Sequence, residues 1–250
     1  MSYCLGILTQ EGLAMMGDTR TNAGVDNIAI FRKLSVFDIP GDRAIVVATA
    51  GNLATSQTVV SLLTEGFENR DTGQLESILT VSSMFKAAHL VGRAVQEAHR
   101  MIGATTSLDQ QASHSFDVTL LLGGQIHGGR LRLFMIYDAG NFIEATSDTP
   151  YLQIGEHKYG KPILDRAVNE GTSIADALKL GLISMDSTMR SNLAVGMPID
   201  IAVIRRDAIS LALQQRIDAD DPYFDNLRTN WSEALRIAYQ AIPAPPYEMS

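Results

Sequence analysis

The sequence predicts a four-layer αββα sandwich, in which two β-sheets lie between two layers of helices. Two observations lead to this prediction. The cores of the expected strands, for example 5–8 and 44–48, are apolar almost without interruption, as in strands that are covered on both faces. The expected elements also follow one another as strands, two helices, strands, two helices and strands, an order that two covered sheets accommodate.

Turn signals and apolar periodicity define the elements of the first half. Pro40-Gly41-Asp42 is typical of a hairpin loop, and Asn52 is a suitable N-cap for the helix that follows it. In the next helix, apolar residues recur at a spacing of three to four. The expected elements are strands at 2–9, 12–18, 34–39 and 43–50 and helices at 53–66 and 75–102.

The second half continues the alternation. A helix over 173–189 is expected to open at Thr172 or Ser173. The elements expected here are strands at 116–123, 130–138, 142–147, 199–205 and 208–213 and helices at 159–169, 173–189 and 229–240. We expect one domain over 1–240 and an extended tail over 241–250, because the tail's prolines cannot continue a helix.

Composition narrows the class of protein. Hydrophobic residues make up 46% of the 250 residues, which can support a large core, and the net charge of -8 argues against binding to nucleic acid. No apolar stretch reaches the roughly 18 residues of a membrane span, and no Lys or Arg precedes residue 10. Cys4, the only cysteine, excludes an internal disulfide. We therefore expect a cytoplasmic protein with no membrane partner.

Ser2 is the first residue that could carry chemistry. Initiator methionine is normally removed when the next residue is small, so loss of Met1 would give Ser2 a free α-amine. One residue would then hold a hydroxyl nucleophile and an amine that acts as its general base, with a pKa near 7.7–8.0. The alternative is that Met-Ser is an ordinary start without chemical meaning.

Asp18 and Lys33 are candidate partners of Ser2. Asp18 ends the second expected strand, and Lys33 precedes the third. A lysine ammonium beside the hydroxyl would stabilise its ionised form and lower the pKa of the α-amine, while Asp18 would hold the lysine in place. The alternative is a turn aspartate and a surface lysine.

Three segments near the start of the chain form one pattern, namely Gly-Asp-Thr-Arg-Thr-Asn-Ala-Gly at 17–24, Arg-Lys-Leu at 32–34 and Ala-Thr-Ala-Gly-Asn at 48–52. In order and spacing this pattern resembles proteasome β-subunits. The segments 24–28, 31–33, 159–166 and 196–200 resemble, more narrowly, the bacterial homologues called Anbu, the ancestral β-subunit family. The resemblance implies an α+β fold of the N-terminal-nucleophile hydrolases and a catalytic role for Ser2, Asp18 and Lys33.

The resemblance also assigns roles to residues that carry no signal of their own. It makes the backbone N–H of Gly51 an oxyanion donor, although a glycine that simply ends a strand fits equally well. It places Thr21 and Thr49 in the specificity pocket and so makes them candidate substrate-binding residues.

Two segments depart from the family's pattern. Gly155-Glu156-His157-Lys158 replaces a serine-containing segment, so the hydroxyl expected there is absent. Glu156 or His157 could substitute for it, or the segment could be a solvated loop. Asp186 keeps the aspartate of a later motif, whereas the serine at Ser191 is shifted in register; both are kept as catalytic candidates.

The sequence therefore predicts a serine- or threonine-type peptidase that cleaves amide bonds through Ser2 and needs no metal or organic cofactor. Two alternatives stay open: an amidase of the same fold for one small amide, and a catalytically silent assembly subunit. The resemblance further implies a homo-oligomer with an open or helical arrangement. The sequence carries no signal for an unfoldase partner.

Overall fold

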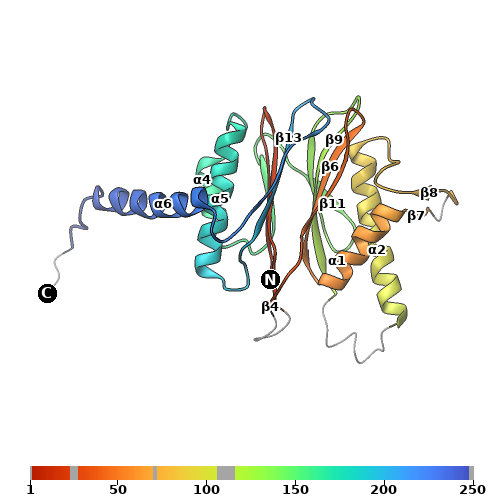
Figure 1. Cartoon of the computed structure of the whole chain (residues 1–250), viewed down its shortest axis with the longest axis horizontal. Coiled ribbons are helices and arrows are strands. Elements are labelled where there is room, and N and C mark those ends of the chain that lie inside the picture. The colour runs from red at the N-terminus through yellow and green to blue at the C-terminus, as the bar shows by residue number, and fades with distance from the viewer. Residues whose placement is uncertain (1, 23–27, 70–71, 106–115, 248–250) are drawn as a thin grey trace.

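The protein is arranged in four layers, as the sequence predicts (Figure 1). The computed structural model describes residues 2–22, 28–69, 72–105 and 116–247. Two five-stranded sheets face each other, and each is covered on its outer face by a pair of helices. Every strand pairing in both sheets is antiparallel.

The first sheet carries the N-terminus of the chain. Its strand order is β12-β1-β2-β13-β14, and helices α4 (Lys161–Ala167) and α5 (Ile174–Ser191) cover it. The strands are β1 (Tyr3–Leu8), β2 (Gly12–Asp18), β12 (Tyr151–Gly155), β13 (Ile199–Arg205) and β14 (Leu211–Ile217). Strand β1 lies between β12 and β2, so pairing on both of its edges fixes the start of the chain.

The second sheet has the order β11-β10-β9-β6-β5 and is covered by α1 (Leu53–Glu65) and α2 (Met84–Thr105). Its strands are β5 (Leu34–Ile39), β6 (Arg43–Gly51), β9 (Val118–Ile126), β10 (Arg132–Ile136) and β11 (Phe142–Glu144). Two short hairpins stand apart, namely β3 (Arg20–Asn22) with β4 (Ile28–Ile30) and β7 (Phe67–Glu68) with β8 (Leu75–Glu76).

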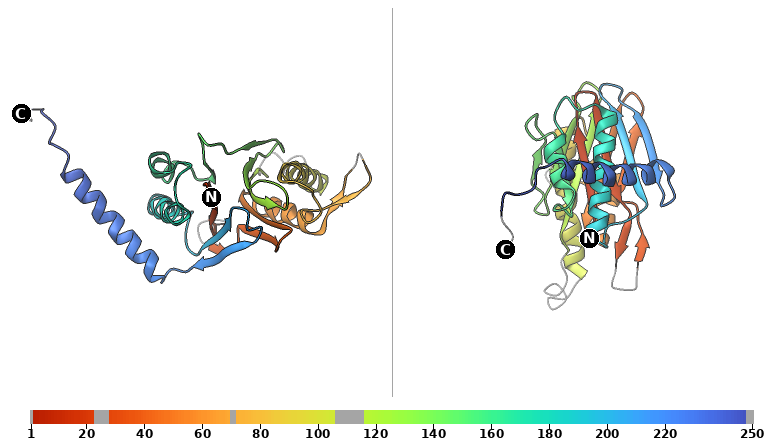
Figure 2. Two further views of the ribbon diagram at one scale, coloured as in Figure 1. Left: turned by 90° about the horizontal axis from the view of Figure 1, so that it is seen from above. Right: turned by 90° about the vertical axis from the view of Figure 1, so that its left-hand side faces the viewer.

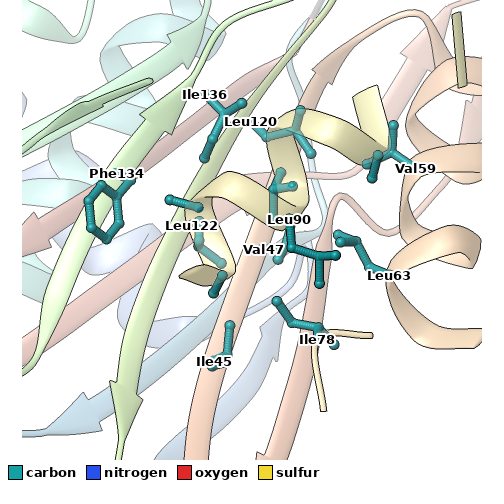
Figure 3. Packing of buried hydrophobic residues seen from close by; sticks show 14 of the residues in the cluster. Ile45, Val47, Val59, Leu63, Ile78, Leu90, Leu120, Leu122, Phe134 and Ile136 are labelled. Atoms are coloured by element: carbon teal, nitrogen blue, oxygen red, sulfur yellow. The ribbon is translucent and has the colours of Figure 1, made fainter. Parts of the chain in front are cut away.

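Three apolar clusters hold the four layers together. One lies between the two sheets, one between the first sheet and α4–α5, and one between the second sheet and α1–α2. Figure 3 shows side chains of the last cluster, where residues of β6 and β9 meet those of α1 and α2. The central strands are therefore buried on both faces, which is the physical reason for their continuous apolar runs.

Helix α6 (Pro222–Gln240) does not follow the layers. It leaves the body beside α5 and projects away from it, as two views show (Figures 1 and 2). Its described buried residues, Phe224 and Leu227, lie in its first two turns. The rest of the helix exposes large apolar side chains, among them Leu235, Ile237 and Tyr239.

Several predicted boundaries need correction. The predicted helix over 75–102 begins only at Met84, because Leu75 and Glu76 pair with β7 as a strand. The last helix begins at Pro222 rather than near residue 229, and the last strand runs over 211–217 rather than 208–213. The strands β3, β4, β7 and β12 are absent from the prediction. Among the described helices, none is both long and apolar enough to cross a lipid bilayer.

Candidate active site

Ser2 lies at the start of β1 and is held through its main chain. Ser2 is buried, with 8% of the residue exposed to solvent. The N–H of Glu156 donates to the Ser2 carbonyl at 2.7 Å, and the N–H of Tyr3 donates to Asp18 Oδ1 at 2.9 Å. Gly155 has a φ of +82°, and a Cβ built there would lie 2.0 Å from the Ser2 oxygen. A glycine is therefore required beside Ser2.

Asp18 and Lys33 form a buried ion pair next to Ser2. Lys33 Nζ lies 2.7 Å from Asp18 Oδ1, and the two side chains are 6% and 0% exposed. Tyr3 N–H and Lys33 Nζ thus contact the same carboxylate oxygen, which places the ammonium beside the peptide bond between Ser2 and Tyr3. Lys33 Nζ also donates to the Arg20 carbonyl at 2.7 Å. The alternative of a surface lysine is wrong.

The second oxygen of Asp18 anchors a distant loop. Gly196 N–H donates to Asp18 Oδ2 at 3.2 Å, across a large separation in sequence. Burial raises the pKa of the Asp18 carboxyl above its ordinary value, although the Lys33 ammonium and the N–H groups of Tyr3 and Gly196 act in the opposite direction. The carboxylate is therefore surrounded by donors on both oxygens, which fixes its orientation toward Lys33.

Gly51 ends β6 with its N–H on the edge that faces Lys33. Along the strand, successive N–H groups point to opposite edges. Thr49 N–H donates to the Lys33 carbonyl at 3.0 Å, whereas Asn52 N–H donates to the Asp117 carbonyl on the other side at 2.9 Å. The Gly51 N–H is two residues beyond that of Thr49 and so shares its edge. Because β5 begins at Leu34 opposite Ala48, its ladder ends before it reaches Gly51.

The end of β6 also adjoins the N-terminal residue. A Cβ built at Gly155 would lie 3.5 Å from Ala50 Cβ as well as against Ser2. A Cβ at Gly51, where φ is +114°, would lie 2.3 Å from the Asp117 carbonyl oxygen. Both positions therefore require glycine. The fold brings Ser2, Asp18, Lys33 and the C-terminal end of β6 into one region.

Thr21 and Thr49 differ in how their polar atoms are used. Thr49 is buried, and its carbonyl accepts a hydrogen bond from Cys4 Sγ at 3.6 Å. Thr21 lies on β3, opposite Ala29. In the part of the chain that the structure describes, its Oγ1 is the buried side-chain polar atom that has no hydrogen-bond partner. Such an atom can accept or donate a hydrogen bond when a ligand approaches.

Asp186 and Ser191 are not brought together with Ser2. Asp186 is buried on α5, and its two oxygens accept hydrogen bonds from Arg190 Nε at 2.9 Å and Arg228 Nε at 2.8 Å. Ser191 is the last residue of α5 and is exposed. Among the described contacts, neither side chain reaches Ser2, and those of Asp186 join α5 to α6 instead.

Glu156 occupies the place where a serine segment was expected. It is buried, with 6% exposed, whereas His157 and Lys158 beside it are exposed. The solvated loop is thus wrong for Glu156. The hydrogen bonds around Ser2 and Asp18 involve four further residues: Tyr3, Glu156, Asn192 and Gly196. Of these, only Glu156 was considered as a site residue from the sequence. The similarity of 196–200 to Anbu was the one other available signal.

Cys4 is part of the core and is not a candidate nucleophile. It is fully buried, and burial raises the pKa of its thiol to about 12. A thiol with such a pKa is protonated and unreactive at neutral pH.

The whole chain is similar to proteins of known structure. The profile described as "Proteasome subunit" matches residues 2–204. An Anbu mutant from Hyphomicrobium sp. strain MC1 is 47% identical, with coverage of 99% of this chain and 100% of that one and a TM-score of 0.88. Anbu from Yersinia bercovieri is also 47% identical, covering 98% and 100%, with a TM-score of 0.86. The chain belongs to the Anbu branch of the proteasome family.

A further Anbu structure concerns assembly. It is described as the helical assembly of the Anbu complex from Pseudomonas aeruginosa, and it is 45% identical, covers 98% of both chains and has a TM-score of 0.89. No curated protein matches the sequence. The Anbu assignment confirms the family predicted from the segments at the start of the chain and at 159–166 and 196–200.

Proposed function

We propose that this Anbu protein is a proteasome-type peptidase that hydrolyses amide bonds through Ser2 once Met1 has been removed. The observation that carries the proposal is the oxygen shared between Lys33 Nζ and Tyr3 N–H. Asp18 Oδ1 accepts from both, at 2.7 and 2.9 Å, so a buried ammonium is fixed one residue from the nucleophile. A lysine that served only the surface would not be buried in this position.

The reaction divides into acylation and deacylation. The Ser2 α-amine takes the proton from the hydroxyl, and the oxygen attacks the carbonyl carbon of the substrate. The Lys33 ammonium stabilises the ionised hydroxyl, and the Gly51 N–H donates to the oxyanion of the tetrahedral intermediate. The amine then passes its proton to the leaving nitrogen as the amide bond breaks. Water attacks the Ser2 ester in the same way and releases the acid.

Substrate binding is assigned to Thr21 and Thr49. The β3 strand that carries Thr21 pairs only with β4 among the described strands, and its buried Oγ1 has no partner. An unpaired buried hydroxyl costs about 1–3 kcal/mol. A substrate group that bonds to Thr21 would recover that free energy, so an extended peptide laid beside β3 would bind with its own polar groups satisfied.

We also propose a homo-oligomer with an open or helical arrangement. The Pseudomonas aeruginosa relative is described as a helical assembly. In this chain, the projecting part of α6 exposes Leu235, Ile237 and Tyr239 by half or more. Most helical stability in proteins comes from tertiary packing, so a second copy is the natural cover for these exposed side chains.

The test combines intact mass with covalent labelling. Purified protein should lack Met1 and gain one equivalent of a peptide epoxyketone, with the adduct mapped to Ser2. Ser2→Ala should abolish the adduct, whereas Cys4→Ala should leave it unchanged because the thiol is buried. Full retention of Met1 in protein that still cleaves a peptide would overturn the mechanism. Equal labelling of Ser2→Ala would assign the electrophile to another residue.

A further inference from the structure

Glu156 combines a main-chain contact to Ser2 with a buried carboxylate. Its N–H extends the pairing of β12 with β1 by one residue, beyond the last registered pair, Tyr3 and Gly155. Only 6% of the residue is exposed. Carboxylates are seldom buried to this extent unless their oxygens are bonded, so its partners indicate what the side chain is for.

Each oxygen of the carboxylate has a different partner. Oε1 accepts from the N–H groups of His157 and Lys158, both at 2.9 Å, and Oε2 accepts from Asn192 Nδ2 at 2.7 Å. Burial raises the pKa of Glu156, but these hydrogen bonds lower it more, so that the net pKa is below the ordinary value. Glu156 is therefore ionised at neutral pH and ties the segment after β12 to the end of α5.

Asn192 passes this connection on to Asp18. Its Oδ1 accepts from the N–H of Ala194 at 2.9 Å, which shapes the loop after α5. Arg20 Nη1 donates to the Leu193 carbonyl at 3.0 Å, and the Gly196 N–H reaches Asp18 Oδ2 at 3.2 Å. The loop over 192–196 is thus fixed at one end by Glu156 and at the other by Asp18.

Ser2 and Asp18 are therefore linked by two routes. The short route is the Tyr3 N–H on Asp18 Oδ1. The long route runs from the Ser2 carbonyl through Glu156 and Asn192 to Gly196 and back to Asp18 Oδ2. The short route holds Oδ1, and the long route adds the hydrogen bond to Oδ2, so that together they restrain rotation of the carboxylate away from Lys33.

Resting on the function proposed above, we propose that Glu156 and Asn192 form a clasp that positions Asp18 and Ser2 relative to each other for acylation. The Glu156–Asn192 clasp takes over the support that a serine side chain gives in the family's pattern. Both members act through other groups and are positioning residues, because the carboxylate and the amide contact one another and the backbone rather than the reacting atoms.

An exchange of partners tests the clasp. In Glu156→Gln, two amide NH₂ groups face each other, and in Asn192→Asp, two carboxylates do. In the double variant, the glutamine Oε1 still accepts from His157 and Lys158, and its Nε2 donates to the new aspartate. The aspartate's other oxygen still accepts from Ala194. Glu11→Gln is the matched control, because Glu11 also accepts a backbone N–H, from Ile174 at 3.0 Å, at the opposite end of β1.

The primary measurement is the rate of Ser2 labelling by a peptide epoxyketone at saturating concentration, with its half-saturation constant determined separately. Each single variant should lower the maximal rate by about 10- to 100-fold, the effect of a displacement near 1 Å at a catalytic group. The double variant should regain most of the wild-type rate, and the half-saturation constant should change little throughout. Glu11→Gln should label normally.

Three results would overturn the clasp as a positioning device. They are single variants that label at the wild-type rate, a double variant no faster than the slower single variant, and a loss that appears only in the half-saturation constant. Backbone hydrogen exchange over 192–198 provides a readout that does not depend on Ser2 labelling. The exchange rate should rise in the single variants and return to the wild-type value in the double variant. If wild-type protein is not labelled at all, the proposed function fails first, and the positioning role fails with it.

Discussion

Replacement of Lys33 by Met separates a catalytic lysine from a structural one. Methionine keeps an unbranched side chain of similar length but removes the ammonium. Lys33 is only 5% exposed, and its Nζ has two partners, Asp18 Oδ1 and the Arg20 carbonyl, both at 2.7 Å. The substitution therefore leaves a fully buried carboxylate with two backbone donors, Tyr3 N–H and Gly196 N–H, and no opposite charge.

Breaking a buried ion pair from one side costs about 3–5 kcal/mol of stability. Part of this loss depends on pH. Without Lys33, the pKa of Asp18 lies further above its unfolded value, so the folded chain binds the proton more tightly than the unfolded chain. Stability then falls as pH rises from the unfolded toward the folded pKa. The difference in unfolding free energy between wild type and Lys33→Met should thus shrink as pH is lowered from 8 toward 5.

The assay measures unfolding and Ser2 labelling on the same protein samples. Labelling of folded Lys33→Met should fall by at least about a hundredfold, as for loss of one stabilising donor at a developing charge. Lys33→Arg should also fail, because a planar guanidinium cannot take the place of a compact ammonium. Lys179→Met is the matched control, since Lys179 pairs with Asp176 at the same 2.7 Å but with both ends half-exposed. It should change neither stability nor labelling appreciably.

A combined mutation tests whether the pair acts as one unit. Asp18→Asn should also slow labelling, and the double variant with Lys33→Met should be little worse than either single, because residues that act together are not additive. Normal labelling by folded Lys33→Met protein would refute the catalytic role. Loss of stability with unchanged labelling would show that the lysine is only structural.

Three further results are expected. Gly155→Ala should destabilise the protein and abolish Ser2 labelling, because the added Cβ clashes with the Ser2 carbonyl, whereas Gly41→Ala, with nearly the same φ but nothing within 4 Å, should lose only the stability that backbone strain costs. Equal unfolding free energies for the two variants would contradict this. Thr21→Val should keep or raise the melting temperature because the Thr21 hydroxyl is unpaired, while Thr188→Val should lower it because the Thr188 hydroxyl donates to the Ser184 carbonyl at 2.9 Å. A reversed order of melting temperatures in calorimetry would disprove that the Thr21 hydroxyl is unpaired. Truncation of 232–250 should convert an oligomer larger than a dimer to smaller species in sedimentation, and an unchanged sedimentation profile would exclude α6 from the interface.

The fold was largely predictable because burial on both faces leaves a strong local signal. Strands such as 43–51, and helices with a capping residue such as Asn52 or Ser173, carry that signal in their own residues. Strand β12 does not. Its five residues become a strand through pairing with β1, which is about 150 positions away in sequence. The same holds for Leu75 and Glu76, whose pairing with β7 prevents the helix predicted there.

The candidate site was predictable in the part that lies in one continuous segment. Asp18 and Lys33 stand at family spacing, and the structure brings them into contact. Glu156 could be considered but not assigned, because its burial depends on β12 and on the loop after α5. Asn192 and Gly196 carry no local signal, since their roles arise from hydrogen bonds made across the whole chain. For Asp186 the motif similarity indicated a catalytic role, whereas the structure shows its carboxylate bound to Arg228, a contact that the motif does not reveal.

The anchoring of residue 2 has a consequence for how this site can change. Its carbonyl is bound by the Glu156 N–H, and the amide that follows it is bound by Asp18. Neither contact involves the serine hydroxyl. The scaffold thus specifies the backbone position of residue 2 whatever its side chain, and threonine or cysteine would stand there with the same backbone placement. Identity of the proposed nucleophile and geometry of the site are separable variables, so one can be exchanged while the other is kept.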